Sequence, residues 1–321
     1  MARRIAVLMS LVLLWDCAFS QDIKTIALVV PFSTGSAQDI YARMLSDPLA
    51  QELGARVLVV NKPGAGGALG AAYVAQAKPD GQTYLLASSG HHLAGALSHQ
   101  LSHQLSYHPL ESFSGAAFTG YSEYVLIAAG DLNVPDLAAF INVIKTHPQT
   151  YNFASSGRGS TTHVGMAAFL ERAGLQMVHL PLKGTNEVIN EVISGRVQAA
   201  MVSALSIQPF KTDPRIKLLA TTGPQRSEYF PKLPTISEFG FGKFKWIAWT
   251  GLLAPLGTPE GSLQNMNHAV SKVLKDPQMK SRFGQLGVSP STMSNQDFNK
   301  FLREDWTHSV AWVSQLKITL D

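Results

Sequence analysis

The order of apolar and polar positions predicts a chain in which buried strands alternate with helices. The first apolar run, residues 26–32, is continuous and rich in β-branched side chains, which is typical of a strand buried on both faces. A helical pattern follows over residues 40–54, where Ser36 and Asp39 are spaced as a capping box and Gly54 is a stop, although Pro48 could end the helix earlier. This alternation favours a parallel sheet with right-handed crossovers, and therefore an α/β fold.

The same rhythm resumes near residue 123 and predicts a second α/β unit. The expected strands are residues 123–130, 150–155, 176–182, 196–203 and 215–223. Residues 230–259 then combine proline, glycine and aromatic side chains, which we interpret as a return crossing between the two units. Two helices end the chain, one capped by Thr258 with Pro259 at its first position and one capped by Ser294.

The amino terminus has the pattern of a secretory signal. Arg3 and Arg4 precede an apolar stretch that is too short to span a bilayer but suits a signal peptide. Small residues before Gln21 predict cleavage after Ser20, so we expect residues 1–20 to be removed and the protein to be exported. An uncleaved anchor is the alternative.

Cysteine content and charge exclude several classes of function. The single cysteine, Cys17, lies in the predicted signal, so the mature chain would have neither a disulfide framework nor a thiol nucleophile. The formal net charge is +4, and no dense run of lysine and arginine occurs, which argues against a nucleic-acid partner. The chain is long enough for two domains with their own cores.

Residues 151–163, YNFASSGRGSTTH, raise the question of a catalytic serine. A nucleophile elbow requires G-x-S-x-G, and neither Ser156 nor Ser160 has glycine at both flanking positions. His163 follows Ser160 by three residues, which does not place a base in line with the hydroxyl. We therefore expect no catalytic residue and no enzyme activity. An exported ester or amide hydrolase is the rival interpretation from another class.

The segment GAGGALG, residues 64–70, has some features of a dinucleotide loop. In the pattern G-x-G-x-x-G, however, its third glycine position is Leu69, and the segment follows the second strand of the unit and not the first. We interpret it as close packing of a helix on the sheet together with a tight turn, and we expect no cofactor.

Histidines near residue 100 suggest a metal site. His99 and His103 are spaced i,i+4, and His91, His92 and His108 lie nearby. The span has no carboxylate before residue 111, so we expect no metal and interpret these histidines as solvated positions on an amphipathic surface.

Three segments run from a strand end through glycine and small hydroxyl residues into a helix: VVPFSTGSAQD, LLASSGHH and YNFASSGRGSTTH. Free backbone N–H groups and the positive end of the helix dipole make such junctions suitable for anions. Two of them, one in each unit, could close on one small anion, or all three could be ordinary helix caps.

A family resemblance adds to this pattern. PFSTGSAQDIYAR, VVNKPGAGGALGAAYVAQAKPDGQTYLLAS, YNFASSGRGSTTH, PLKG, LPTISEFG and WTGLLAPLGTP occur in that order. Together they resemble the Bug family, solute-binding proteins related to those of tripartite tricarboxylate transporters, over nearly the whole mature chain. The resemblance implies an α/β fold of two domains, a type II-like periplasmic binding protein with a hinge and an interdomain ligand cleft. It implies domain I at residues 21–123 and 246–321, and domain II at 124–245.

The resemblance also implies a function and a set of binding residues. A monomer would close on a small carboxylated solute (a dicarboxylate, hydroxy acid, aromatic acid or amino acid) and present it to a membrane transporter, or to a signalling sensor. Domain I would contribute Phe32, Thr34, Gly35, Ser36, Asp39, Ser88 and Ser89. Domain II would contribute Ser155, Ser156, Gly159, Ser160, Thr161, His163, Lys183, Gly184 and Ser203.

This chain departs from the family pattern at two places. Leu182 stands where relatives often have tyrosine, and Val202 and Ser203 stand where relatives often have an aspartate or another small residue. Without that carboxylate the case for an amino-acid solute is weaker, because an ammonium group needs an acidic partner. Arg158 and Lys183 are possible charge partners for a carboxylate.

Overall fold

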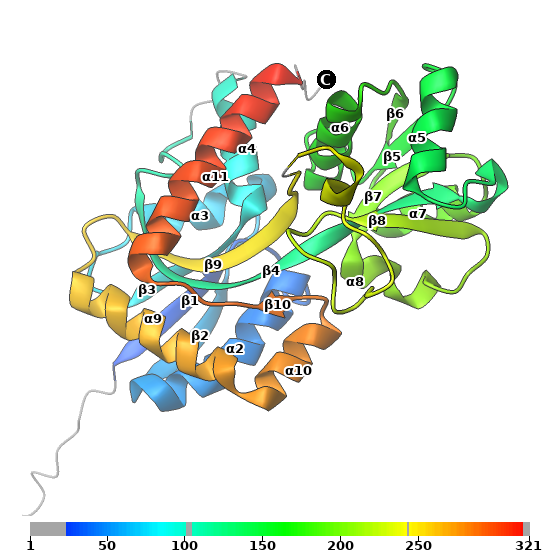
Figure 1. Ribbon diagram of the computed structural model, residues 1–321. Helices are drawn as coiled ribbons and strands as arrows, with labels where there is room; N and C mark the ends of the chain where they lie inside the picture. The colour runs from blue at the N-terminus through cyan, green and yellow to red at the C-terminus, as the bar shows by residue number, and fades with distance from the viewer. Residues whose placement is uncertain (1–23, 101–104, 243, 317–321) are drawn as a thin grey trace, which may run out of the picture.

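The protein has two α/β lobes joined by a long strand, β4, that passes from one lobe into the other (Figure 1). The structure is a computed structural model and describes residues 24–100, 105–242 and 244–316. The predicted signal peptide lies outside these residues. No helix among the described residues has the length and apolar character needed to cross a membrane.

The elements follow one another as the alternating pattern predicts. The strands are β1 (Thr25–Val30), β2 (Arg56–Asn61), β3 (Thr83–Ser88), β4 (Phe113–Ala129), β5 (Asn152–Ser155), β6 (Val178–Pro181), β7 (Ala199–Ser203), β8 (Ile216–Thr221), β9 (Ile247–Pro255) and β10 (Ser289–Pro290). The helices are α2 (Ala37–Leu53), α3 (Ala68–Ala75), α4 (Ser89–Gln100), α5 (Leu137–Thr146), α6 (Thr161–Ala173), α7 (Thr185–Ile193), α8 (Ala204–Ile207), α9 (Glu260–Lys275), α10 (Pro277–Gln285) and α11 (Asn295–Gln315).

The sheet is mixed, whereas the sequence pattern favoured a parallel one. Its order is β2-β1-β3-β9-β4-β7-β5-β6, with β8 and β10 also pairing with β4. The pairs β1–β2, β1–β3, β5–β6 and β5–β7 are parallel, as expected for strands joined by crossover helices. The central pairs β3–β9, β4–β9, β4–β7 and β4–β8 are antiparallel.

The partners of β4 change along its length, and this change defines the two lobes. Residues 113–123 pair with β9, and residues 124–129 pair with β7 and β8. The first lobe therefore contains β1–β3, β9, β10 and the first part of β4, with α2–α4 and α9–α11. The second lobe contains the rest of β4, β5–β8 and α5–α8.

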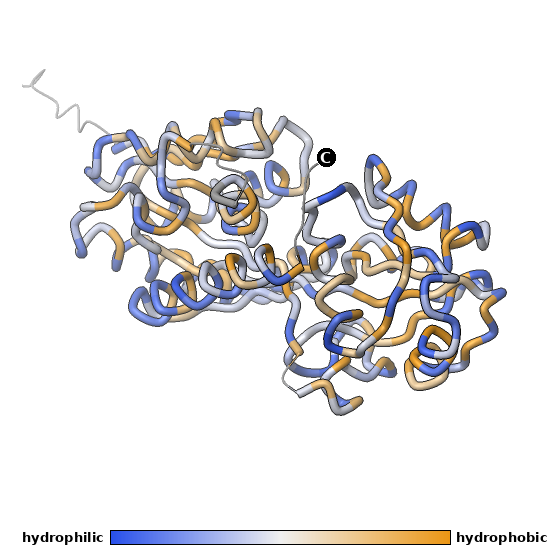
Figure 2. The backbone as a smooth tube through the Cα atoms, turned by 90° about the horizontal axis from the view of Figure 1, so that it is seen from above, coloured by the Kyte–Doolittle hydropathy of each residue, from blue (hydrophilic) through white to orange (hydrophobic). Residues whose placement is uncertain are grey.

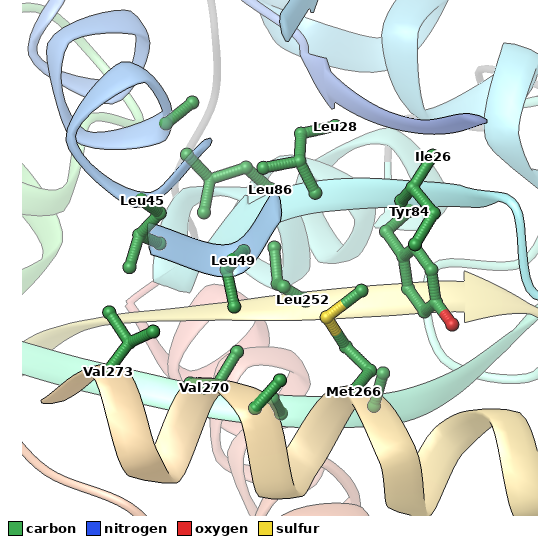
Figure 3. Close-up of a cluster of buried hydrophobic side chains, with 14 of the residues drawn as sticks. Ile26, Leu28, Leu45, Leu49, Tyr84, Leu86, Leu252, Met266, Val270 and Val273 are labelled. Atoms are coloured by element: carbon green, nitrogen blue, oxygen red, sulfur yellow. The ribbon is translucent and has the colours of Figure 1, made fainter. Parts of the chain in front are cut away.

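Each lobe buries apolar side chains on both faces of its sheet. In the first lobe, α2, α9 and α10 cover one face, and the close-up in Figure 3 shows Leu45 and Leu49 of α2 and Val270 of α9 in one buried cluster beside the strands. Helices α3 and α11 contribute to the core on the other face. In the second lobe, α5 and α6 cover one face and α7 and α8 the other. Apolar segments therefore run inside both lobes, with hydrophilic stretches on the outer turns (Figure 2).

Helix α2 continues through Pro48 to Leu53 and ends at Gly54, which adopts the left-handed conformation, as predicted for its stop. Other boundaries differ from those predicted. Strand β4 begins ten residues earlier than expected, and the aromatic segment of residues 230–259 contains the central strand β9. Thr258 does not cap α9, because its hydroxyl donates to the carbonyl of Pro255.

Candidate functional site

The first candidate loop, residues 32–39, connects β1 to the start of α2. Ser36 has an extended backbone and its Oγ accepts the N–H of Asp39, as predicted for an N-cap. The Asp39 carboxylate does not complete the predicted capping box; it accepts the N–H of Gly35 at 2.8 Å. Thr34 and Gly35 are exposed at the tip of the loop, in front of the helix N-terminus.

Asp39 is buried and organises this loop from inside. Besides Gly35, it accepts Nδ2 of Asn61 at 2.9 Å and Nε of Arg43 at 3.0 Å. The hydrogen bond from Arg43 and that from the backbone of Gly35 lower the pKa of Asp39 to about 2. The amide of Asn61 also donates to the carbonyl of Phe32 at 3.0 Å. Asp39 therefore shapes the loop from a buried position.

The second candidate loop, residues 155–163, leads from β5 into α6. Ser160 caps α6 in the same way that Ser36 caps α2, with its Oγ accepting the N–H of His163. Thr162 is buried, and its Oγ1 lies 2.9 Å from Ser156 Oγ and 3.0 Å from Ser160 Oγ. Gly159 has a φ of 71° and donates its N–H to Nδ1 of His163. His163 therefore orients the loop.

A stack of rings supports this loop from below. The imidazoles of His163 and His179 lie face to face, with ring centroids 3.8 Å apart, and Phe153 stacks on His179 at 4.8 Å. Nε2 of His179 lies 2.7 Å from the Oγ of Ser155, which is fully buried and also donates to the carbonyl of Gly157. Ser155, like Asp39, is buried and holds the loop through its hydrogen bonds.

The loop that follows β6 lies against the second candidate loop. The N–H of Leu182 donates to the carbonyl of Ser155 at 2.9 Å. Lys183 is exposed, and its N–H donates to the side chain of Glu187, while Gly184 begins α7. Because β5, β6 and β7 run in the same direction, their carboxyl ends meet at one edge of the sheet.

Backbone pairing brings the strand ends of the two lobes toward the same part of β4. Ser88, at the end of β3, pairs with Thr250 of β9, whose Oγ1 accepts a hydrogen bond from Thr119 of β4 at 2.9 Å. A few residues further along β4, Tyr124 pairs with Ser203, which ends β7 and caps the short helix α8. The carboxyl ends of β3 and β7 therefore flank the strand that joins the lobes.

Side chains from this junction hold the start of α6. The hydroxyl of Tyr124 donates to Oγ1 of Thr161, and the indole Nε1 of Trp246 donates to the carbonyl of Thr161, both at 2.9 Å. Thr161 and Ser89 also line one cavity of about 650 Å³ that lies beside α11. The structure thus brings a predicted residue of each lobe to a shared cavity.

Four residues that position the predicted ones were missed in the sequence: Asn61, Tyr124, His179 and Trp246. Asn61 lies within a motif that carries the family resemblance, and Trp246 lies three residues before another. An asparagine at a strand end is the kind of residue that could have been singled out. Tyr124 and His179 look like ordinary strand residues in the sequence. Only their contacts in the structure show that they position Thr161 and Ser155.

The glycine-rich segment of residues 64–70 serves close packing, as we interpreted it. Gly64, Gly66 and Gly67 have positive φ values, which suits a tight turn. A Cβ on Gly70 would lie 2.8 Å from Cα of Pro31 and 3.0 Å from the carbonyl of Lys62. Helix α3 can therefore approach the end of β1 only because residue 70 lacks a side chain.

The expectation that the histidines near residue 100 are solvated is wrong for His92, which is buried, while His91 and His108 are half-buried and bonded to backbone groups. Nε2 of His91 lies 2.8 Å from the carbonyl of Pro109, and buried His92 pairs with Asp305 at 2.8 Å. Nδ1 of His108 accepts two backbone N–H groups. Among the described residues, no group of three or more His, Cys, Asp or Glu side chains could hold a metal ion. The side chains of His99 and His103 lie outside the described part.

The stacked histidines predict acid sensitivity. Burial, followed by the charge of Arg158, lowers the pKa of His163 from 6.5 to about 4, and burial followed by His163 lowers that of His179 to about 4. Between pH 6.5 and 4 the unfolded chain therefore binds more protons than the folded one. The stability from these groups is complete above pH 6.5 and falls as the pH drops toward 4.

The test compares urea midpoints at pH 4.5 and 7 for the wild type and for a variant with His163→Gln and His179→Gln. We expect the variant to lose less stability between the two pH values than the wild type. The exposed His268→Gln on α9 is the control and should behave as the wild type. Equal acid sensitivity in all three proteins would contradict this account of the stack.

Comparison with known proteins identifies the family. The profile described as "Tripartite tricarboxylate transporter family receptor" matches residues 41–318. A protein of Agrobacterium vitis, encoded in the ttuE-ttuC' intergenic region, is 30% identical over 90% of this chain and 83% of its own length. BugT of Bordetella pertussis is 29% identical over 88% of this chain and 86% of its own.

Solved structures share the fold. The periplasmic binding protein BugD has a TM-score of 0.72 at 26% identity, covering 92% of this chain and 98% of its own. MatC from Rhodopseudomonas palustris, with bound malate, has a TM-score of 0.70 at 27% identity, covering 90% and 98%. An R. palustris protein with adipate has a TM-score of 0.75 at 25% identity, covering 92% and 98%. With two α/β lobes of this fold and a family match over most of its length, the chain belongs to the tripartite tricarboxylate transporter receptor family of periplasmic solute-binding proteins.

Proposed function

We propose that this protein is exported to the periplasm through a cleavable signal peptide, captures a small carboxylated solute between its lobes and presents it to a membrane transporter. The observation that carries the proposal is the pair of strand-to-helix junctions. Ser36 in one lobe and Ser160 in the other each cap a helix whose N-terminus directs free N–H groups outward. Neutral donors of this kind hold a carboxylate reversibly, which suits a receptor that must release its solute.

The relatives support the chemical class of the solute. Two structures of this fold contain small carboxylates, adipate in one and malate in the other. The change of strand partners between Glu123 and Tyr124 supports the domain division at residues 123/124, with the return at 245/246. Closure would then bend the chain where β4 and the segment before β9 cross between the lobes.

The contacts of the serines support a receptor over a hydrolase. The Oγ of Ser160 contacts Thr162 and caps α6. The Nδ1 of His163 already accepts the N–H of Gly159. Ser155 does contact a histidine, but it is fully buried and thus closed to a substrate. We therefore infer that Ser160 binds and does not react.

Replacing Ser160 by alanine tests this assignment. We expect the affinity for a carboxylate, measured by calorimetry, to fall several-fold, together with a loss of about 1 kcal/mol of stability for the missing cap. Ser294→Ala is the matched control, because Ser294 caps α11 with the same geometry, far along the chain from either loop. It should lose similar stability and keep the wild-type affinity.

Two results would overturn the proposal. One is ester hydrolysis by the purified mature protein that Ser160→Ala abolishes. The other is the absence of any saturable carboxylate binding across a panel of mono-, di- and hydroxycarboxylates. Mass spectrometry of solute released from gently purified protein gives an independent answer.

A further inference from the structure

The first lobe contains a second cavity of about 300 Å³ at the same end of its sheet as the candidate site. Its lining includes Phe32, in the first candidate loop, and Ser88, the last residue of β3. Both are among the residues expected at the solute site. A solute held at the N-terminus of α2 therefore lies beside the cavity, which continues toward α3 and α4.

Three elements form the walls of this cavity. Leu85 and Ala87 of β3 are buried at its floor, and Gly66 and Gly67 bring backbone to one side. One face of α4 closes the other side, since its residues at positions 91, 94, 95 and 98 all line the cavity. Tyr107 completes the wall; its ring stacks on that of His91 with centroids 5.8 Å apart.

The chemistry of the lining is neutral throughout. None of the residues that line the cavity is a lysine, arginine, aspartate or glutamate. His91 is the one titratable base, and burial lowers its pKa to about 3, so it is uncharged at neutral pH. Its Nε2 lies 2.8 Å from the carbonyl of Pro109, so the single N–H of the neutral ring donates to that carbonyl. A charged group placed here would find no opposite charge among the lining residues.

The size suits a ring or a short alkyl chain. An apolar cavity of about 150 Å³ is enough to bind benzene, so one of this volume has room for a phenyl group. Small-molecule sites commonly combine a few polar groups that fix orientation with an apolar region that accepts the rest of the ligand. Here the polar groups would come from the two candidate loops and the apolar region from this cavity.

We propose that the solute is a monocarboxylate whose neutral aromatic or alkyl part enters the first-lobe cavity. This inference rests on the proposed function, because the carboxylate must be held at the loops for its other end to reach the cavity. It separates the protein from receptors for solutes charged at both ends, such as dicarboxylates, and from receptors for amino acids.

Calorimetry with matched solutes tests the proposal. Hexanoate and adipate have six carbons each and differ in the second carboxylate, and 3-phenylpropanoate carries a ring. We expect hexanoate and 3-phenylpropanoate to bind at least about tenfold more tightly than adipate, because the cavity has no partner for a second charge. Tighter binding of adipate than of both monocarboxylates would overturn the proposal and leave carboxylate capture intact.

Filling the cavity gives a second, independent readout. Ala94 and Ser98 lie one turn apart on α4 and both line the cavity, so we would make Ala94→Phe and Ser98→Phe separately. Each should weaken 3-phenylpropanoate binding at least about tenfold, while acetate, which has no tail to place, keeps its affinity. Ala138→Phe, at an exposed alanine of α5, is the control and should change neither solute.

The outcomes separate the two proposals. If both filling variants bind 3-phenylpropanoate as the wild type does, the cavity is not the subsite, although the receptor function stands. If no carboxylate binds to any of these proteins, the receptor function fails, and the subsite fails with it.

Discussion

Replacing Asp39 by alanine is expected to destabilise the protein and to weaken carboxylate binding together. The change removes the acceptor of two donors, the N–H of Gly35 in the loop and the Nδ2 of Asn61 at the end of β2. Losing these hydrogen bonds to a charged acceptor would cost roughly 1.5–3 kcal/mol of unfolding free energy. Because Gly35 lies at the N-terminus of α2, the loop would also lose its shape. Each 1.4 kcal/mol of binding free energy lost in this way lowers the carboxylate affinity about tenfold, and we expect a loss of at least this size.

Asp47→Ala is the matched control, since Asp47 lies on the same helix and is exposed. It should stay close to the wild type in urea midpoint and in affinity. Asp39→Asn gives a further comparison, because it keeps the shape of the side chain but removes the charge that faces Arg43. If Asp39→Ala unfolds at the same urea concentration as Asp47→Ala, the role assigned to this carboxylate is wrong.

Gly165→Ala is expected to have an effect of similar size through the second lobe. Gly165 lies in the second turn of α6, and a Cβ there would overlap the indole of Trp246 and approach the sulfur of Met201. Forcing an extra carbon into such a contact typically costs about 1–3 kcal/mol. A displaced Trp246 would also lose its hydrogen bond to the carbonyl of Thr161, so the start of α6 and the solute affinity should both suffer.

The same substitution at Gly261 provides the control. Gly261 lies in the first turn of α9, is exposed, and has open space around the position of a Cβ. Alanine there should stabilise the helix by about 0.5–1 kcal/mol, because it restricts the unfolded chain more than glycine does. A thermal melt that shows Gly165→Ala to be as stable as Gly261→Ala would disprove the contact with Trp246.

The helix starts could be predicted from sequence because their causes are local. Ser36, Ser160 and Ser294 each cap a helix by accepting the N–H three residues later, as the spacing of small hydroxyls and helical patterns predicts. The order of elements and the family resemblance were also available from the sequence. The residues that contact a solute stay a prediction.

Strands formed by distant pairing could not be predicted in this way. The first part of β4 contains Gly115 and Gly120 among small and polar residues, so it lacks the apolar run of a buried strand. It is a strand because β9 pairs with it across more than a hundred residues. Similarly, the environment of His92 depends on Asp305, which is 213 residues away. Local patterns contain no information about such partners.

The position of β9 has a consequence for the order in which the chain can fold. This strand lies between β3 and β4 and completes the first-lobe sheet, yet it is synthesised only after the entire second lobe. Until residues 247–255 arrive, one edge of β3 has no strand paired with it. The second lobe can reach its native pairing first, and the first lobe must wait for the carboxyl-terminal quarter of the chain. Because long-range pairing of this kind slows folding, the first lobe is expected to become compact late.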